Sequence, residues 1–279
     1  MRDDGAVRPF SFCLLPLALF AALTAPLFAQ NTQPELSARL AGKPLILKGF
    51  WSDDKLKFDE SGRPSKRYAT STFTLAGFDA DTVKVSGHAL QITGVRMGLT
   101  WDAKGALMRV PLYVNKDKTP EKLVVEVDCH AACDFGTALD AIFAANLADI
   151  VPLLPDYWQR YAAVHFLPTA DDSSSPHDVI IKGAYHVGGG ITPPKILHSV
   201  DPEFSEVARR QKFSGNVMVY LWVEKDGTTS HLQIARPIGY GLDEKAIEAV
   251  AQYQFRPASK KNGDPVAVDL FIDVNFQIF

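Results

Sequence analysis

Residues 215–238 read GNVMVYLWVEKDGTTSHLQIARPI, and this stretch decides the fold of the C-terminal part of the chain. Lys225-Asp226-Gly227 is a hairpin turn signal between two apolar runs. The first run alternates as a β-strand does, with Val217, Val219, Leu221 and Val223 on one face and Met218, Tyr220 and Trp222 on the other. The stretch therefore predicts two antiparallel strands.

A helix is expected on each side of this hairpin. Before it, Asp201 is an N-cap residue in front of Pro202, and Gly215 follows as a stop signal. After it, Gly239 and Gly241 precede the apolar stripe of a second helix, formed by Leu242, Ala246, Ile247, Val250 and Phe255. The prediction is two helices packed on a small antiparallel sheet.

The last strand has the most regular alternation in the chain. One face is expected to lie in the core: Val266, Val268, Leu270, Ile272, Val274, Phe276 and Ile278. The other face is expected to be mostly solvent-exposed: Ala267, Asp269, Phe271, Asp273, Asn275, Gln277 and Phe279. A strand of this length whose backbone is not fully paired can accept an extended peptide as an added strand.

These segments resemble the C-terminal domain of the TonB family over residues 201–234 and 239–276. The most specific matches are Asp226-Gly227 in the turn, Gly241-Leu242-Asp243 at the second helix and Phe255-Arg256-Pro257-Ala258 after it. The family usually has Tyr-Pro before the first helix, where this chain has Asp201-Pro202. We therefore place a TonB-type domain at residues 195–279.

The resemblance implies a periplasmic energy-transducer domain that pairs its last strand with the peptide box of an outer-membrane TonB-dependent receptor. It implies no catalytic residue, cofactor or metal. A second copy of the chain could use the same strand and form a homodimer. The predicted partner-binding residues are Asp269, Phe271, Asp273, Asn275, Gln277 and Phe279.

Two features of the family are missing. Transducers have an N-terminal membrane helix whose Ser and His face an inner-membrane motor, whereas the apolar segment here contains Ser11 and no His. They also have a long Pro-rich spacer, which a folded domain replaces here. The alternative function is therefore a secreted envelope or cell-wall ligand-binding protein that uses the fold without energy transduction.

The N-terminus resembles a secretory signal peptide. Arg2 and Arg8 precede the uncharged stretch PFSFCLLPLALFAALTAPLFA at 9–29, which ends in a small residue. We expect cleavage after Ala29 and release into the periplasm. The alternative is an uncleaved anchor, which would make an inner-membrane motor complex a further partner, although three prolines interrupt the stretch.

Residues 30–168 predict a β-rich α+β domain of unrecognised type. Its expected strands are KPLILKGFW, STFTLAGF, TVKVSGHALQITGV, ALMRVPLYVN and KLVVEVDC. A helix is expected through Leu139, Ile142, Phe143 and Leu147, followed by a stretch with Tyr157, Trp158 and Tyr161 that packs on the sheet. Residues 169–194 predict a flexible linker with one short strand, DVIIKGAY, at 178–185.

Cys129 and Cys133 are the cysteines that remain after signal cleavage, in the sequence CHAAC. In an oxidising compartment they can form a local disulfide if the backbone turns between them. The alternative is a metal site with His130, but zinc takes four ligands and the nearby sequence lacks a fourth.

Composition limits the remaining function classes. The 279 residues are 47% hydrophobic and carry a formal net charge of -3 without a dense Lys/Arg stripe, so nucleic acid is not an expected partner. Ser52 and Lys55 have the S-x-x-K spacing of serine hydrolases but lack that family's companion motifs, so an enzyme is not expected. Exposed aromatic residues could instead stack on cell-wall sugars: Phe50, Trp51, Trp101, Tyr157 and Trp158.

Overall fold

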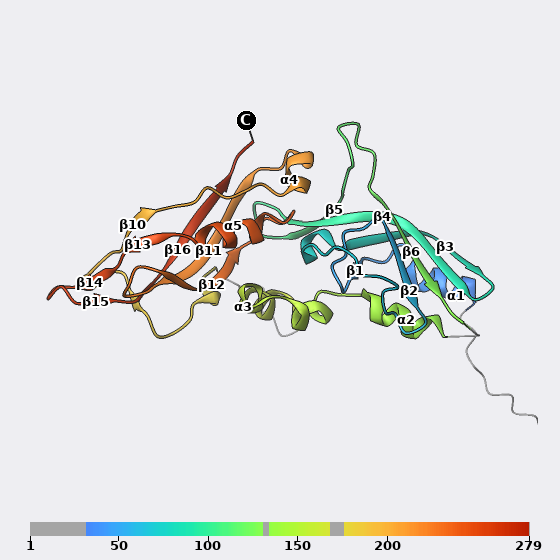
Figure 1. Cartoon of the computed structure of the whole chain (residues 1–279), viewed down its shortest axis with the longest axis horizontal. Helices are drawn as coiled ribbons and strands as arrows, with labels where there is room; N and C mark the ends of the chain where they lie inside the picture. The colour runs from blue at the N-terminus through green and yellow to red at the C-terminus, as the bar shows by residue number, and fades with distance from the viewer. Residues whose placement is uncertain (1–31, 131–133, 168–175, 279) are drawn as a thin grey trace, which may run out of the picture. The chain divides into compact units, whose positions relative to one another are not determined.

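The computed structural model describes residues 32–130, 134–167 and 176–278 (Figure 1). All of them belong to one compact unit, Asn31–Phe279. The expected signal segment, residues 1–29, lies outside the described residues. Within the described part, every helix is too short or too polar to span a bilayer.

The first half of this unit is built on a seven-stranded sheet with the spatial order β2-β6-β4-β3-β1-β7 and with β5 paired to β4. Neighbours are antiparallel except β2 and β6, which run parallel. The mainly antiparallel sheet expected from the alternating segments is thus confirmed. The strands are β1 (Leu45–Leu47), β2 (Lys55–Asp59), β3 (Gly77–Ser86), β4 (Ala89–Trp101), β5 (Leu107–Pro111), β6 (Lys122–Asp128) and β7 (Phe143–Ala144).

Two strand predictions in this half are corrected. Most of the expected strand STFTLAGF is instead the 3-10 turn η1 (Phe73–Leu75), which begins where the Thr72 side chain accepts the Thr74 N–H; only its last two residues, Gly77 and Phe78, belong to a strand, β3. The strand β2, which lies in the segment KLKFD, was not predicted. Its Leu56 and Phe58 are buried, so β2 follows the same alternation over too short a run to stand out.

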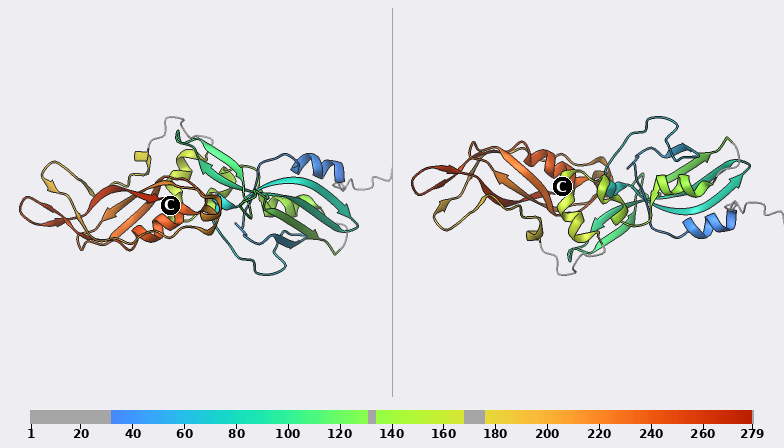
Figure 2. Two further views of the ribbon diagram at one scale, coloured as in Figure 1. Left: turned by 90° about the horizontal axis from the view of Figure 1, so that it is seen from above. Right: turned by 90° about the horizontal axis from the view of Figure 1, so that it is seen from below.

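Four helical segments accompany this sheet: α1 (Gln33–Leu40), α2 (Phe135–Ile142), η2 (Ala148–Leu153) and α3 (Asp156–His165). A capping box between Thr32 and Glu35 starts α1, which packs on β3 (Figure 2). The expected helix through Leu139 and Ile142 forms as α2, but Phe143 is already the first residue of β7. In α3, Trp158 is fully buried and packs on Phe73 and Trp101, as predicted for this stretch.

The segment expected as a linker contributes short elements to the second half. They are η3 (Pro176–Val179), β8 (Tyr185–His186), β9 (Ile191–Thr192) and β10 (Lys195–His198). The short strand expected at 178–185 is limited to β8, which begins at its last residue. β8 pairs with the last strand of the chain, β9 with β14 and β10 with β13.

The central sheet of the second half has the order β12-β11-β16-β8. The predicted hairpin forms as β11 (Gly215–Val223) and β12 (Thr229–Arg236), with a turn in which Gly227 donates to the Glu224 carbonyl. The remaining strands are β13 (Gln254–Arg256), β14 (Ala258–Lys260), β15 (Pro265–Val266) and β16 (Val268–Phe276).

The two predicted helices are α4 (Glu206–Gln211) and α5 (Leu242–Val250), and both differ from the prediction in detail. Asp201 is not the N-cap of α4. Ser205 takes that place, since its hydroxyl accepts the Ala208 N–H and also donates to the Tyr240 carbonyl. Phe255 lies in β13 and not in α5.

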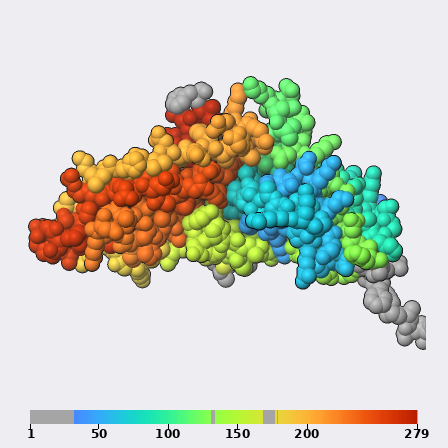
Figure 3. Space-filling model, in the orientation of Figure 1, coloured from blue at the N-terminus to red at the C-terminus, as the bar shows by residue number. Residues whose placement is uncertain are grey.

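The central sheet is covered on one face and on part of the other. As predicted, Val217, Val219, Leu221 and Val223 are fully buried on the face that contacts α5. On the opposite face, which was expected to be mostly solvent-exposed along the last strand, Asp273, Asn275 and Gln277 are exposed. Elsewhere on this face α3 and η3 pack on β12, and Tyr220 is fully buried. Figure 3 shows the yellow-green atoms of α3 against the orange atoms of the C-terminal strands.

Candidate functional site

The outer edge of β16 is open over most of its length. On its inner side β16 pairs with β11 without interruption from Val268 to Phe276. On its outer side β8 pairs with Val268 and Asp269 only. Among the described residues, no strand pairs with β16 on this side beyond Asp269.

The direction of the backbone groups follows from one hydrogen bond. The Tyr185 N–H donates to the Ala267 carbonyl at 2.9 Å, so Ala267 points toward the outer side. In a strand the N–H and C=O of one residue point to the same side, and successive residues alternate. Because the pairing with β11 has no bulge, the peptide groups of Phe271, Asp273 and Asn275 point away from the sheet.

The first predicted partner-binding residue, Asp269, is not on a solvent-exposed surface. Its side chain is 7% exposed, and its carboxylate lies 2.7 Å from Nδ1 of His186 on β8. This position was expected on a solvent-exposed face, and the correction arises because β8 covers it. Binding of a partner at Asp269 stays a prediction that would require β8 to leave.

Phe271 is half-buried at the start of the open edge. Its ring contacts the ring of Tyr220 at 5.4 Å and that of His177 at 5.1 Å between centroids. The side chain therefore packs on the covered face of the sheet, while its peptide group points outward. A partner strand would meet its backbone and only part of its ring.

Asp273 and Asn275 are exposed, and Asp273 forms an ion pair with Arg236 at 2.8 Å. That pair bridges across β11, and with both side chains about half exposed it contributes little to stability. Gln277 is exposed beyond the end of β16, and Phe279 lies outside the described residues. The structure thus brings three of the six predicted residues to the open edge: Phe271, Asp273 and Asn275.

A buried pair of carboxyl groups at the start of α5 holds the second half against the first. Asp243 accepts the N–H groups of Ile238 and Gly239, each at 2.8 Å, and so fixes the loop before the helix. Glu244 Oε1 accepts from Thr72 Oγ1 at 2.7 Å and from Trp158 Nε1 at 2.9 Å. Glu244 therefore accepts hydrogen bonds from Thr72, the N-cap residue of η1, and from Trp158 of α3.

Burial raises the pKa of both carboxyl groups, and their mutual repulsion raises that of Asp243 further. Both Asp243 oxygens already accept backbone N–H groups, whereas Glu244 Oε2 is buried without a hydrogen-bond partner among the described residues. Of the two carboxyl groups, Glu244 is the one with an oxygen that no hydrogen bond occupies.

The same junction includes close backbone contacts. Thr100 Oγ1 donates to the Ile238 carbonyl at 2.7 Å, and the Gly241 N–H donates to Thr74 Oγ1 at 3.1 Å. Gly239 has a φ of 89°, and a Cβ there would lie 2.1 Å from the Leu99 carbonyl oxygen. Only glycine fits this position.

In the sequence, Gly239, Gly241 and Asp243 indicated only the start of a helix. The contact of this loop with β4 and the pairing of His186 with Asp269 were not predicted. The one available signal was the acidic pair Asp243-Glu244 beside an apolar helix stripe, where a buried carboxylate requires partners.

The other candidate sites resolve as follows. Cys129 is in a disulfide, and Cys133, its expected partner, lies outside the described residues. His130 lies 3.3 Å from Glu60, and across the described ranges no cluster of three or more His, Cys, Asp or Glu side chains could hold a metal ion. Trp101 and Trp158 are buried against each other, so the idea that they stack on sugars is wrong.

Comparison with known proteins identifies the second half. Residues 200–278 match the family model "Gram-negative bacterial TonB protein C-terminal". "Protein TonB" of Vibrio cholerae is 30% identical over 87 residues, which cover 31% of this chain and 35% of that protein. "Protein tonB2" of Pseudomonas aeruginosa is 35% identical over 69 residues, which cover 24% of this chain and 25% of that protein.

The solution NMR structure of the Pseudomonas aeruginosa TonB CTD aligns with 33% of this chain and 93% of its own at a TM-score of 0.25 and 15% identity. The chain matches about a third or less of the length of the two full-length relatives. Residues 200–278 are a TonB C-terminal domain.

Proposed function

We propose that this chain is a periplasmic protein-binding module in energy-coupled transport across the outer membrane. Its open β16 edge would add an extended peptide, such as the box of an outer-membrane TonB-dependent receptor, as a further strand of the central sheet. The observation that carries the proposal is the row of outward peptide groups at Phe271, Asp273 and Asn275 on an edge that β8 covers only at its start.

The edge also explains why a peptide is the expected partner. Unpaired N–H and C=O groups bind another backbone at the spacing of a sheet. Backbone hydrogen bonds contribute about 0.5–1.5 kcal/mol each, so a short peptide would bind weakly and reversibly. The proposal assigns the chain no chemical reaction.

The test compares two substitutions at Asn275. Asn275→Pro removes an outward N–H but leaves the ladder with β11, whereas Asn275→Ala removes the side chain and keeps the N–H. We expect Asn275→Pro to weaken binding of synthetic receptor-box peptides by about tenfold or more, and Asn275→Ala to change it by less than about twofold. Calorimetry measures both, and circular dichroism verifies folding.

If folded Asn275→Pro binds these peptides as well as the parent chain, addition of a strand to this edge is wrong. If the parent chain binds none of them, the receptor is not the partner. A homodimer through the same edge would appear as a concentration-dependent mass in sedimentation that Asn275→Pro abolishes.

Whether the chain couples to an inner-membrane motor depends on the N-terminal segment. We propose cleavage after Ala29, which would give a periplasmic chain without a direct motor contact. Intact mass and fractionation after expression in a Gram-negative host test this. A full-length chain in the inner membrane would support an anchored transducer instead.

The second candidate function is an envelope ligand-binding protein that uses the TonB fold without energy transduction. It is favoured by the folded first half, which includes a cavity separate from the β16 edge.

A further inference from the structure

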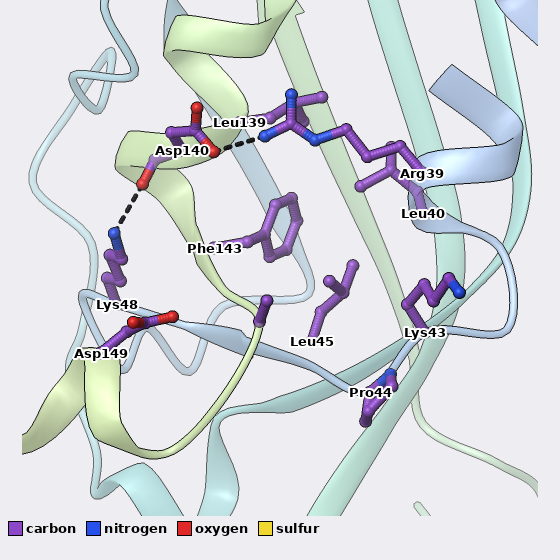
Figure 4. Close-up of a pocket in the computed structure, with 11 residues that line it drawn as sticks. Arg39, Leu40, Lys43, Pro44, Leu45, Lys48, Leu139, Asp140, Phe143 and Asp149 are labelled. Carbon is purple, nitrogen blue, oxygen red and sulfur yellow. Dashed lines mark hydrogen bonds and ion pairs between the residues drawn. The ribbon is translucent and has the colours of Figure 1, made fainter. Parts of the chain in front are cut away.

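A cavity of about 520 Å³ lies in the first half of the chain, between α1, β1, α2 and β7 (Figure 4). This volume is in the range of pockets that hold small organic ligands. Four apolar side chains that are almost fully buried form its inner wall: Leu40, Leu45, Leu139 and Phe143. The inside of the cavity would therefore favour an apolar group.

The cavity is held open by regular structure. β1 and β7 pair with each other, with Leu47 opposite Phe143. The wall residues Leu45 and Phe143 therefore lie on neighbouring strands. The Phe143 ring stacks on the Phe78 ring with centroids 5.7 Å apart and an interplanar angle of 10°. The Lys48 N–H donates to the Ile142 carbonyl at 2.9 Å, which fixes the β1 end beside α2. A ligand would meet a preformed wall.

The lining carries more positive than negative groups, although the whole chain has a net charge of -3. Arg39, Lys43 and Lys48 contribute cations, and Asp140 and Asp149 contribute carboxylates. Figure 4 shows the charged ends around the apolar centre formed by Phe143 and Leu45.

Not all of these charges are compensated within the protein. Arg39 is paired with the Asp140 carboxylate, and Lys48 Nζ donates to the Asp140 backbone carbonyl at 2.7 Å. Lys43 is exposed, and its side chain has no hydrogen bond or ion pair with any described residue, although its backbone N–H donates to the Leu40 carbonyl at 3.2 Å. Its ammonium group is available to a ligand at the opening. Lys48 has a neutral partner and Asp149 has no ion pair with a described residue, so these two opposite charges offset each other within the lining.

We propose that this cavity binds a small amphipathic anion, such as an organic carboxylate with an apolar body. The body would lie against Phe143 and Leu45, and the anionic head would lie at the Lys43 ammonium group. This site shares no residue with the β16 edge and does not depend on the proposed function. A cationic ligand of the same shape would be repelled by Lys43.

The test uses the fluorescent anion 8-anilinonaphthalene-1-sulfonate bound to the full chain, displaced by dodecanoate below its critical micelle concentration. Dodecyltrimethylammonium, which has the same tail and the opposite charge, is the ligand control. We expect dodecanoate to displace the probe and the cation to displace it at least about tenfold less well, as the loss of a charge-assisted contact implies.

The matching test on the protein reverses the charge of one lysine that lines the cavity and, as the control, of one lysine that does not. Lys43→Glu should weaken dodecanoate binding about tenfold, whereas Lys116→Glu, an exposed lysine between β5 and β6 that does not line the cavity, should change it less than about twofold. Ala145→Trp, at an exposed position on the cavity lining, should block binding while both lysines remain.

Equal displacement by dodecanoate and the cation, or equal effects of Lys43→Glu and Lys116→Glu, would overturn the proposal. Since Lys43 is exposed and has no described partner to lose, its variant should fold even if Ala145→Trp does not.

Discussion

At Gly239 the backbones of the two halves lie in direct contact, through a bridge between Gly239 and Thr100. The φ of Gly239 is 89°, and an added Cβ would lie 2.1 Å from the Leu99 carbonyl oxygen, a backbone atom that cannot rotate away. Gly263 has nearly the same φ of 88° but open space around its added Cβ. The pair therefore separates the effect of backbone conformation from that of close packing.

We expect Gly239→Ala to destabilise the chain more than Gly263→Ala does. Both substitutions incur the conformational penalty of a positive φ, about 1 kcal/mol, whereas only Gly239→Ala forces β4 and the loop apart. The difference in the free energy of unfolding should be about 2 kcal/mol or more. Urea denaturation measures it, and equal losses would show that the contact with Leu99 is loose.

Glu244 should make stability depend on pH. Its pKa is raised in the folded chain by burial, so the folded state keeps a proton that the unfolded state releases above about pH 4.3. Below that pH both states are protonated and the folded state has no penalty. As the pH rises through the folded pKa, this stability is lost.

We therefore expect Glu244→Gln, which imitates the neutral acid, to gain stability relative to the parent chain between pH 5 and pH 8. The gain should increase as the pH rises, because the parent chain loses its buried proton and Gln has none to lose. Glu206→Gln, at an exposed position at the start of α4, is the control. If the parent chain and Glu244→Gln respond alike to pH, burial does not raise the pKa of Glu244.

At the scale of the elements, β8 competes with any partner for the start of the β16 edge. It is held there by the Tyr185 N–H on Ala267 and by His186 beside Asp269. Two residues of pairing are a weak attachment, and the Tyr185 side chain is 48% exposed. Its displacement would lengthen the edge available to a peptide.

We expect Tyr185→Pro, which removes the ladder N–H, to tighten binding of receptor-box peptides about threefold or more. One lost hydrogen bond of about 1 kcal/mol sets this scale. Tyr185→Ala keeps the N–H and separates the loss of the ring, which lies under Lys260, from the loss of the bond. Calorimetric titration gives both affinities, and weaker binding by Tyr185→Pro would mean that β8 supports the partner.

The elements that could be predicted are those set by local patterns. The turn at 225–227, the strands on either side of it and the α5 stripe depend on residues near one another in the sequence. The start of α4 could not be predicted, because Ser205 is chosen as N-cap partly through its bond to Tyr240, which lies far along the chain. β8 depends on a parallel pairing between even more distant residues.

The candidate site was predictable to the same degree. Alternation along β16 indicated which peptide groups could point outward, and Asn275 retains that position in the structure. The burial of Asp269 could not be predicted, because it requires His186 to be placed beside it by β8. The cavity near Phe143 was not predicted either, since four separate elements form it.

At the scale of the whole molecule, the first half covers a sheet face that a separate C-terminal domain would expose. α3 and η3 pack on β12. The Tyr220 hydroxyl accepts the Ile181 N–H at 3.0 Å and donates to the Ile181 carbonyl at 3.2 Å. Thus the domain boundary predicted at residues 194–195 would separate Tyr220 from both its cover and its hydrogen-bond partner.

The contribution of this cover to stability can be measured by comparing three chains of increasing length. We expect residues 195–279 to be the least stable, residues 176–279 to regain the η3, β8 and Ile181 contacts, and residues 31–279 to be the most stable because α3 and the Glu244 bonds are restored. Residues 176–279 should have a free energy of unfolding about 2 kcal/mol higher than residues 195–279, as expected for two hydrogen bonds and the burial around Tyr220. Hydrogen exchange of the β11 and β12 amides reports the stability of the same sheet in each chain. If exchange in residues 195–279 is as slow as in the longest chain, the C-terminal domain folds independently and the first half adds a ligand site without supporting the sheet.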